Sequence, residues 1–152
     1  MHTSQTTMSA LQTLLLQQSL AVLATQGEQH PYTSLVAFAA TDDLRHLLFV
    51  TSRTTTKYQN LLRKHDIALL IDDRTTSNQD FKAGIALTVL GQALELTATQ
   101  HAAHLPTFLK KHPSLEAFTR TPSTALFTVE VQRYLLVTQF QQVVEININE
   151  LS

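Results

Sequence analysis

The chain has 152 residues, of which 43% are hydrophobic and 15% are charged, and its net charge is −1 at pH 7. This length suits one domain with a single core. A nearly neutral charge gives no electrostatic basis for binding nucleic acid or acidic membranes. Cysteine is absent, which excludes disulfides, thiolate nucleophiles and cysteine-ligated metal centres.

The sequence shows no secretory signal, and its longest apolar runs, at residues 35–40 and 67–71, are far too short to cross a membrane. We therefore expect a cytoplasmic protein with neither a membrane nor a nucleic acid as partner. Repeats, linkers and breaks in composition are missing. We predict a single domain over residues 1–152, with its core at about residues 10–148.

The first third of the chain is predicted to form a helix followed by three strands. Ser9 is placed to cap a helix that carries Leu11, Leu14 and Leu15 on one face and ends near Ser19. The strands that follow are Leu20–Thr25, Tyr32–Ala40 and Leu47–Thr51. Each connection is too short for a crossover helix, so the strands form an antiparallel meander.

A helix is predicted next, over Thr55–Lys64, because Tyr58, Leu61 and Leu62 share one helical face. The remaining strands are predicted at Ile67–Asp72, Gly84–Thr97, Ala125–Val131, Tyr134–Thr138 and Val143–Ile148. Gly91 is expected to allow a bulge or bend that lets a sheet curl. Between these strands we expect a mobile polar loop at Arg74–Lys82 and a helix over Gln100–Lys111 and Ser114–Phe118 that is interrupted at Pro106 and Pro113.

This order predicts a mainly β fold with flanking helices: an antiparallel barrel of six or seven strands, with the Thr55–Lys64 helix crossing one end. Glycine-rich phosphate loops of the dinucleotide-binding or nucleoside-triphosphatase type are excluded, because the chain has only three glycines and none has the required spacing.

The segment from Thr51 to Lys57 is the strongest candidate for a binding site. Five hydroxyl side chains lie within seven residues, and Arg53 and Lys57 add positive charge at the start of a helix, where free N–H groups favour a phosphate. The alternative interpretation is a threonine-rich capped turn beside a solvated arginine and lysine. The residues alone leave both interpretations open.

The histidines and paired aspartates do not indicate a metal or catalytic site. His101 and His104 can face the same way on a helix, but no acidic partner is spaced to complete a metal site, so none is predicted. The other histidines in predicted turns are interpreted as surface residues: His30, His46, His65 and His112. The Asp42-Asp43 and Asp72-Asp73 pairs follow strands, as is usual in turns. Catalytic residues cannot be identified.

Several ordered motifs resemble the pyridoxamine 5'-phosphate oxidase-like, FMN-binding split-barrel family. They are a strand at Leu20–Thr25, a proline-led strand at His30–Val36, an aromatic strand with hydroxyl residues leading to a lysine helix at Phe49–Leu61, a strand at Ile67–Asp73 and a glycine strand at Leu87–Leu96. Together they cover about residues 10–140. The resemblance implies a split barrel that binds FMN as an oxidoreductase and acts on an unidentified small-molecule substrate.

The resemblance also implies a set of cofactor-binding residues. Thr51, Ser52 and Lys57 occupy the places that hold the flavin phosphate, and the main chain of Ser34, Leu35 and Val36 would contact the flavin ring. The family's usual arginine before the helix lysine is Thr56 here, so we expect Arg53 to supply that contact instead.

Two further departures separate the chain from true pyridoxamine phosphate oxidases. The glutamine that those enzymes have five residues before the strand glycine is Ala86 here, and tryptophan, part of their substrate signature, is absent. Haem-degrading relatives use a histidine near the C-terminus, whereas the last histidine here is His112. The alternative function is a split-barrel dimer without flavin that acts as a binding or regulatory module.

The resemblance implies a homodimer with the cofactor site at the subunit interface. A small barrel fills its interior with side chains, so a flavin must bind outside, where a second copy would supply the missing wall. The charge-poor strands Tyr32–Ala40 and Leu87–Leu96 are candidate contact surfaces.

Overall fold

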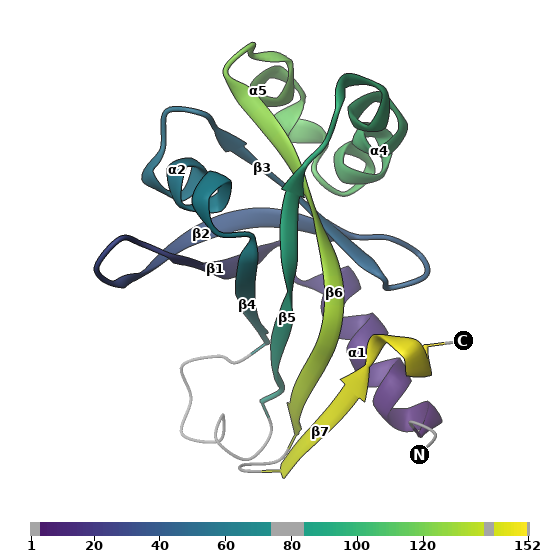
Figure 1. Ribbon diagram of the computed structural model, residues 1–152. Helices are drawn as coiled ribbons and strands as arrows, with labels where there is room; N and C mark the ends of the chain where they lie inside the picture. The colour runs from purple at the N-terminus through teal and green to yellow at the C-terminus, as the bar shows by residue number, and fades with distance from the viewer. Residues whose placement is uncertain (1–3, 74–83, 139–141, 152) are drawn as a thin grey trace.

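The computed structural model describes residues 4–73, 84–138 and 142–151 (Figure 1). Its strands are β1 (Leu20–Gln26), β2 (Pro31–Ala40), β3 (His46–Ser52), β4 (Asp66–Asp72), β5 (Ala86–Glu95), β6 (Thr124–Thr138) and β7 (Gln142–Asn147). Its helices are α1 (Gln5–Gln17), α2 (Thr56–Arg63), α4 (Ala98–Lys111) and α5 (Glu116–Arg120), with 3-10 turns η1 (Pro113–Leu115) and η2 (Ile148–Glu150). Within these ranges, no helix has the length and apolar character needed to span a membrane.

The strands form one antiparallel sheet in the order β3-β2-β1-β4-β5-β6-β7, and β3 also pairs with β6. This additional pairing closes β1 to β6 into a barrel, to which β7 is added along β6. The β3–β6 ladder runs from Ser52 opposite Thr124 to His46 opposite Glu130. The prediction of a mainly β, antiparallel barrel of six or seven strands is therefore confirmed.

The core follows from the alternation of side chains along each strand. Phe49 of β3 and Phe127 of β6 lie opposite each other in the closing ladder, and their rings stack with centroids 5.2 Å apart. Helix α1 adds three buried leucines to this core: Leu11, Leu14 and Leu15. A second, smaller cluster forms outside the barrel, where Phe108 of α4 packs against outward side chains of β2, β3 and β6: Ala39, Leu48, Val50 and Leu126.

Strands β2 and β3 separate after a short ladder. They pair only from Phe38 opposite Phe49 to Ala40 opposite Leu47, whereas β3 continues along β6 as far as Ser52. Among the described residues, the part of β2 before Phe38 therefore pairs with β1 alone, and its other edge is open. Helix α2 lies beside this split and contacts β1 and β2 (Figure 1).

Two predicted helix boundaries were wrong. Helix α1 begins earlier than predicted, with Ser4 as its N-cap accepting a hydrogen bond from the Thr7 N–H, because its polar first turn carries no apolar pattern. Helix α4 continues through Pro106 instead of breaking there. A proline deprives the carbonyl four residues earlier of its donor, and here Ala102 is exposed, so water can satisfy that carbonyl.

Two further predictions were wrong, and a third lies beyond the described residues. The separate strands predicted at Ala125–Val131 and Tyr134–Thr138 form one long strand, β6. His112, interpreted as a surface residue, is buried, and its Nε2 lies 2.7 Å from the carbonyl oxygen of Phe38. The loop expected at Arg74–Lys82 falls outside the described residues.

The predicted irregularity at Gly91 is confirmed. The β5–β6 register shifts there, because Leu90 faces Arg133 while Gly91 faces Val131, so Gln132 is the extra residue of a bulge in β6. A Cβ atom on Gly91 would lie 2.3 Å from the main-chain oxygen of Glu130. Glycine is required here because the two main chains approach each other too closely for any side chain.

A Gly91→Ala substitution should therefore lower the free energy of unfolding by about 1–3 kcal/mol, since the new methyl group must push the main chain of β6 aside. Urea denaturation followed by circular dichroism measures this change. The control is Gln92→Ala, which alters an outward, half-buried position of the same strand and should shift stability by no more than about 0.5 kcal/mol. Equal stability of Gly91→Ala and the wild type would contradict the close approach.

Candidate functional site

The turn between β3 and α2 is built from hydroxyl side chains that bond to one another. Thr51 is buried at the end of β3, and its Oγ1 lies 3.1 Å from that of Thr55. Thr55 is the N-cap of α2 and accepts a hydrogen bond from the Tyr58 N–H. The Oγ of Ser52 lies 2.9 Å from the Oγ1 of Thr54. These contacts explain why a run of threonines stops the strand and starts a helix at this point.

The first turn of α2 offers donors that the protein itself does not use. The main-chain N–H groups of Thr56 and Lys57 precede the first possible intrahelical donor, and they have no partner in the described part of the chain. The half-buried Lys57 ammonium likewise has no carboxylate partner among the described residues, and burial lowers its pKa. An anion placed here would meet N–H groups, the positive end of the helix dipole and a cation.

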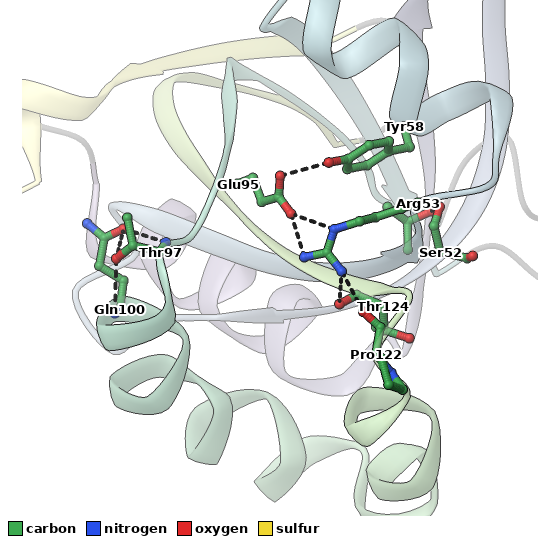
Figure 2. Close-up of polar contacts among 9 residues, drawn as sticks. Ser52, Arg53, Tyr58, Glu95, Thr97, Gln100, Pro122 and Thr124 are labelled. Carbon is green, nitrogen blue, oxygen red and sulfur yellow. Dashed lines mark hydrogen bonds and ion pairs between the residues drawn. The ribbon is translucent and has the colours of Figure 1, made fainter.

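Arg53 lies in the same turn, but protein groups engage its guanidinium (Figure 2). Its Nε and Nη2 donate to Oε1 of Glu95 over 3.1 and 2.8 Å, and its Nη1 donates to the carbonyls of Pro122 and Thr124 over 2.8 and 3.1 Å. These four bonds use all but one of the five N–H donors of arginine. In this geometry Arg53 is not available to replace the family's missing arginine at Thr56.

Sequence reasoning missed Glu95, the centre of this network. Its Oε2 accepts a hydrogen bond from the Tyr58 hydroxyl over 2.9 Å. The Glu95 carboxylate raises the pKa of Arg53, and burial followed by the bond to Glu95 raises that of Tyr58. A signal was present, because Glu95 continues the inward series of β5 after Val89 and Ala93, where an acid requires a partner.

Strand β2 forms the other side of the split. Leu35 points outward and is 64% exposed, whereas Val36 is buried in the core. The Oγ of Ser34 is buried and has no hydrogen-bond partner within the described ranges, although buried hydroxyls are normally paired. The structure thus places Ser34, Leu35 and Val36 on an open strand edge.

The seven residues named from the sequence therefore fall into three groups. Thr51, Ser52 and Lys57 line the β3–α2 turn, and Ser34 to Val36 form the open edge across the split. Arg53 is directed to Glu95 instead. Two cavities lie elsewhere: one of about 400 Å³ between α1, α4 and β2, and one of about 360 Å³ beside Leu20 and Leu70. The β3–α2 turn lines neither of them. Across the described ranges, no group of three or more acidic or histidine side chains could hold a metal ion.

Comparison with known families now identifies the chain. A family model described as pyridoxamine 5'-phosphate oxidase matches residues 7–138. The chain belongs to this family. Membership of the pyridoxamine 5'-phosphate oxidase family confirms the resemblance noted in the sequence, while no curated protein matches the chain.

Solved structures share the fold at low sequence identity. A protein from Clostridium acetobutylicum related to general stress protein 26 has a TM-score of 0.77 and 13% identity, with 99% of this chain and 100% of that one covered. An FAD-binding protein from Mesorhizobium loti has a TM-score of 0.65 and 16% identity, covering 84% and 91%. A haem-binding protein from Mycobacterium smegmatis has a TM-score of 0.80 and 16% identity, but 91% of this chain spans only 56% of it. These similarities show the fold alone, so the ligand must be argued from the chain's own residues.

Proposed function

We propose that the protein is a cytoplasmic, FMN-binding oxidoreductase, active as a homodimer on a small-molecule substrate that remains to be identified. The observation that carries the proposal is the pairing of two unsatisfied features across the β2–β3 split. On one side are the Lys57 ammonium and the first N–H groups of α2, which have no partner among the described residues. On the other is the open main-chain edge of β2 at Ser34–Val36.

The donors present fit a phosphate monoester. The main-chain N–H groups of Thr56 and Lys57 and the Lys57 ammonium would bind phosphate oxygens, with the hydroxyls of Thr51 and Ser52 close by at the end of β3. A helix N-terminus with one neighbouring cation is a common arrangement for phosphate binding. Burial lowers the pKa of Lys57, and a bound dianion would raise it again by stabilising the charged form.

The open edge of β2 suits the flavin ring. Its main-chain groups near Leu35, which are unpaired within the described ranges, offer donors and acceptors to the polar edge of an isoalloxazine, and the buried hydroxyl of Ser34, also without a partner there, lies on the same segment. When bound, FMN would supply hydride or electron transfer. The protein's part would be to hold the phosphate at Lys57, to orient the ring along β2 and to exclude water. We assign no catalytic side chain.

True pyridoxamine phosphate oxidation is not proposed. Thr56 and Ala86 replace family residues, the tryptophan signature is missing, and Arg53 is engaged by Glu95. The engagement of Arg53 favours the second candidate, a flavin-free dimer that acts as a binding or regulatory module. The absorption spectrum of the purified protein separates the two, since a flavin band near 450 nm belongs only to the first.

The dimer is proposed from an exposed apolar row on the outer face of the barrel. The strand registers align Leu35, Val22, Leu70, Thr88 and Leu135 side by side across β2, β1, β4, β5 and β6. Leu35 and Leu70 are 64% and 46% exposed. Val22, Thr88 and Leu135 are half-buried, and the next position along the same row is Glu145 of β7. The five residues of the row carry no charge, as is typical of interface cores, and exposed apolar patches often mark contact surfaces.

The row also explains how the cofactor site would be completed. It begins at Leu35, within the open edge of β2, so a partner packed on this face would border the flavin. A two-fold pairing, the commonest symmetry of homo-oligomers, would place two equivalent sites at the interface. A single copy offers only a strand edge and a helix end, whereas ligand pockets enclose most of their ligand.

The first test of this function is Lys57→Ala. Loss of the charge-assisted hydrogen bond should weaken FMN binding by about 1.5–3 kcal/mol, as measured by the quenching of FMN fluorescence on titration with protein. Because the Lys57 ammonium loses its charge at a lower pH than an ordinary lysine, wild-type affinity should fall as the pH rises into the alkaline range, and the variant should lose this dependence.

Riboflavin, which lacks the phosphate, serves as the matched ligand for that test. Its affinity should be the same for the wild type and for Lys57→Ala, at every pH. If Lys57→Ala bound FMN as tightly as the wild type does, the phosphate site would have to lie elsewhere. If the wild type did not bind FMN at all, the proposed function would be wrong.

The second test concerns the assembly. Leu70→Glu should break the dimer, because two copies of a carboxylate would be buried at the centre of the apolar row without partners. Light scattering should give a mass near 17.0 kDa for this variant and twice that for the wild type. The control, Leu16→Glu, alters a more exposed leucine on α1 that is not part of the row and should remain dimeric. A monomeric wild type would exclude the shared site.

A further inference from the structure

We propose that Glu95 is a positioning residue for phosphate binding: it holds Arg53 and Tyr58, and these two residues fix the turn that presents Lys57. This inference rests on the proposed function and adds to it an acidic residue that promotes the binding of an anion. It does so without touching the ligand, through the shape of the turn.

Glu95 contacts residues on both sides of Lys57 in the sequence. Oε1 accepts from the Nε and Nη2 of Arg53, at the start of the turn, and Oε2 accepts from the hydroxyl of Tyr58, directly after Lys57. Figure 2 shows the carboxylate between these two side chains, 42 and 37 residues away in the chain. The segment that carries the free N–H groups is therefore held at both ends by a single carboxylate.

The carboxylate is itself fixed in place. Glu95 is the last residue of β5, and two residues later Thr97 and Gln100 form the capping box that starts α4 (Figure 2). Reciprocal capping of this kind restricts the main chain at the strand–helix junction. Glu95 thus attaches the turn to a rigid part of the barrel.

Arg53 links the turn to a third segment. Its Nη1 donates to the carbonyls of Pro122 and Thr124, and its main-chain N–H donates to the carbonyl of Ser123 over 2.8 Å. The remaining bonds of the turn are local, such as those between Ser52 and Thr54. Beyond the end of the β3–β6 ladder, Arg53 and Tyr58 therefore attach the turn to the barrel, and Asn60, which donates to Oγ1 of Thr25, attaches the next turn of α2.

Two opposite expectations follow for Glu95→Gln. If Glu95 acted only through its charge, its removal would strengthen anion binding, since a nearby negative charge would be lost and Arg53 would be released toward the phosphate. If Glu95 positions the turn, its removal weakens anion binding, because a neutral amide holds the guanidinium less firmly than a carboxylate does and the donors must then be ordered when the ligand binds.

The experiment compares the dissociation constants of FMN and riboflavin for the full chain, Glu95→Gln and Tyr58→Phe. We expect Glu95→Gln to lower FMN affinity about five- to tenfold and Tyr58→Phe to lower it less, with riboflavin affinity unchanged in both. Glu116→Gln is the matched control, since it removes the same charge from an exposed pair with Arg120 on α5 and should alter neither ligand.

Hydrogen exchange in the ligand-free protein provides a second readout. The hydrogen-bonded amides of this segment, those of Thr54, Thr55 and Tyr58, should exchange faster in Glu95→Gln than in the wild type, while those of the β5–β6 ladder stay protected. Tyr58→Phe gives the same test with a nearly isosteric side chain, should Glu95→Gln fail to fold.

The other possible results would reject either the positioning role of Glu95 or the phosphate site itself. Tighter or unchanged FMN binding, an equal loss for FMN and riboflavin, or unchanged exchange in the turn would reject the positioning role, and FMN binding by the wild type would then still support the proposed function. A wild type that binds FMN no better than riboflavin would reject the phosphate site itself, and the role of Glu95 with it.

Discussion

The pairing of β3 with β6 is the constraint on which the rest of the structure depends. Strand β3 pairs with β6 along its whole length but with β2 over only three residues, and the stacked rings of Phe49 and Phe127 support the longer ladder from inside the barrel. Because β3 stays with β6 beyond the end of its ladder with β2, the part of β2 before Phe38 is not paired with β3 along its free edge. The open edge at Ser34 and the turn that begins α2 are thus both consequences of one ladder.

The separation of β3 from β2 also determines where the charged side chains lie at the split. A turn that leaves a barrel edge needs new attachments, and Arg53 supplies them through Glu95 and two main-chain carbonyls. Because the arginine is used in this way, Lys57 remains as the cation without a partner in the described turn. In this chain the two cations of one segment therefore differ: Arg53 holds the turn, while Lys57 has no partner among the described residues.

Local features of the sequence predicted the fold well and the site in part. Strands such as Ile67–Asp72 were found because apolar runs between turn residues report burial directly, and the Gly91 irregularity was found because a glycine inside a strand often marks a bulge or a close approach of two main chains. The partners of Arg53 could not be predicted, since Glu95 lies 42 residues away and only the barrel brings the two together. The predicted break at Pro106 was wrong for a related reason. The free-energy cost of a proline inside a helix depends on whether the carbonyl left without a donor, here that of Ala102, can reach water, and no local pattern reveals this.

The closing ladder also has a consequence for how the protein is made. The ring of Phe49 emerges from the ribosome long before Phe127, so β1 to β5 can form only an open, curled sheet whose apolar inner face is uncovered until β6 has been synthesised. Contacts between segments so distant in sequence form slowly, and nascent chains with uncovered edges are prone to aggregation. Synthesis of β6, rather than of the N-terminal meander, is therefore the step at which chaperones would matter most for this protein.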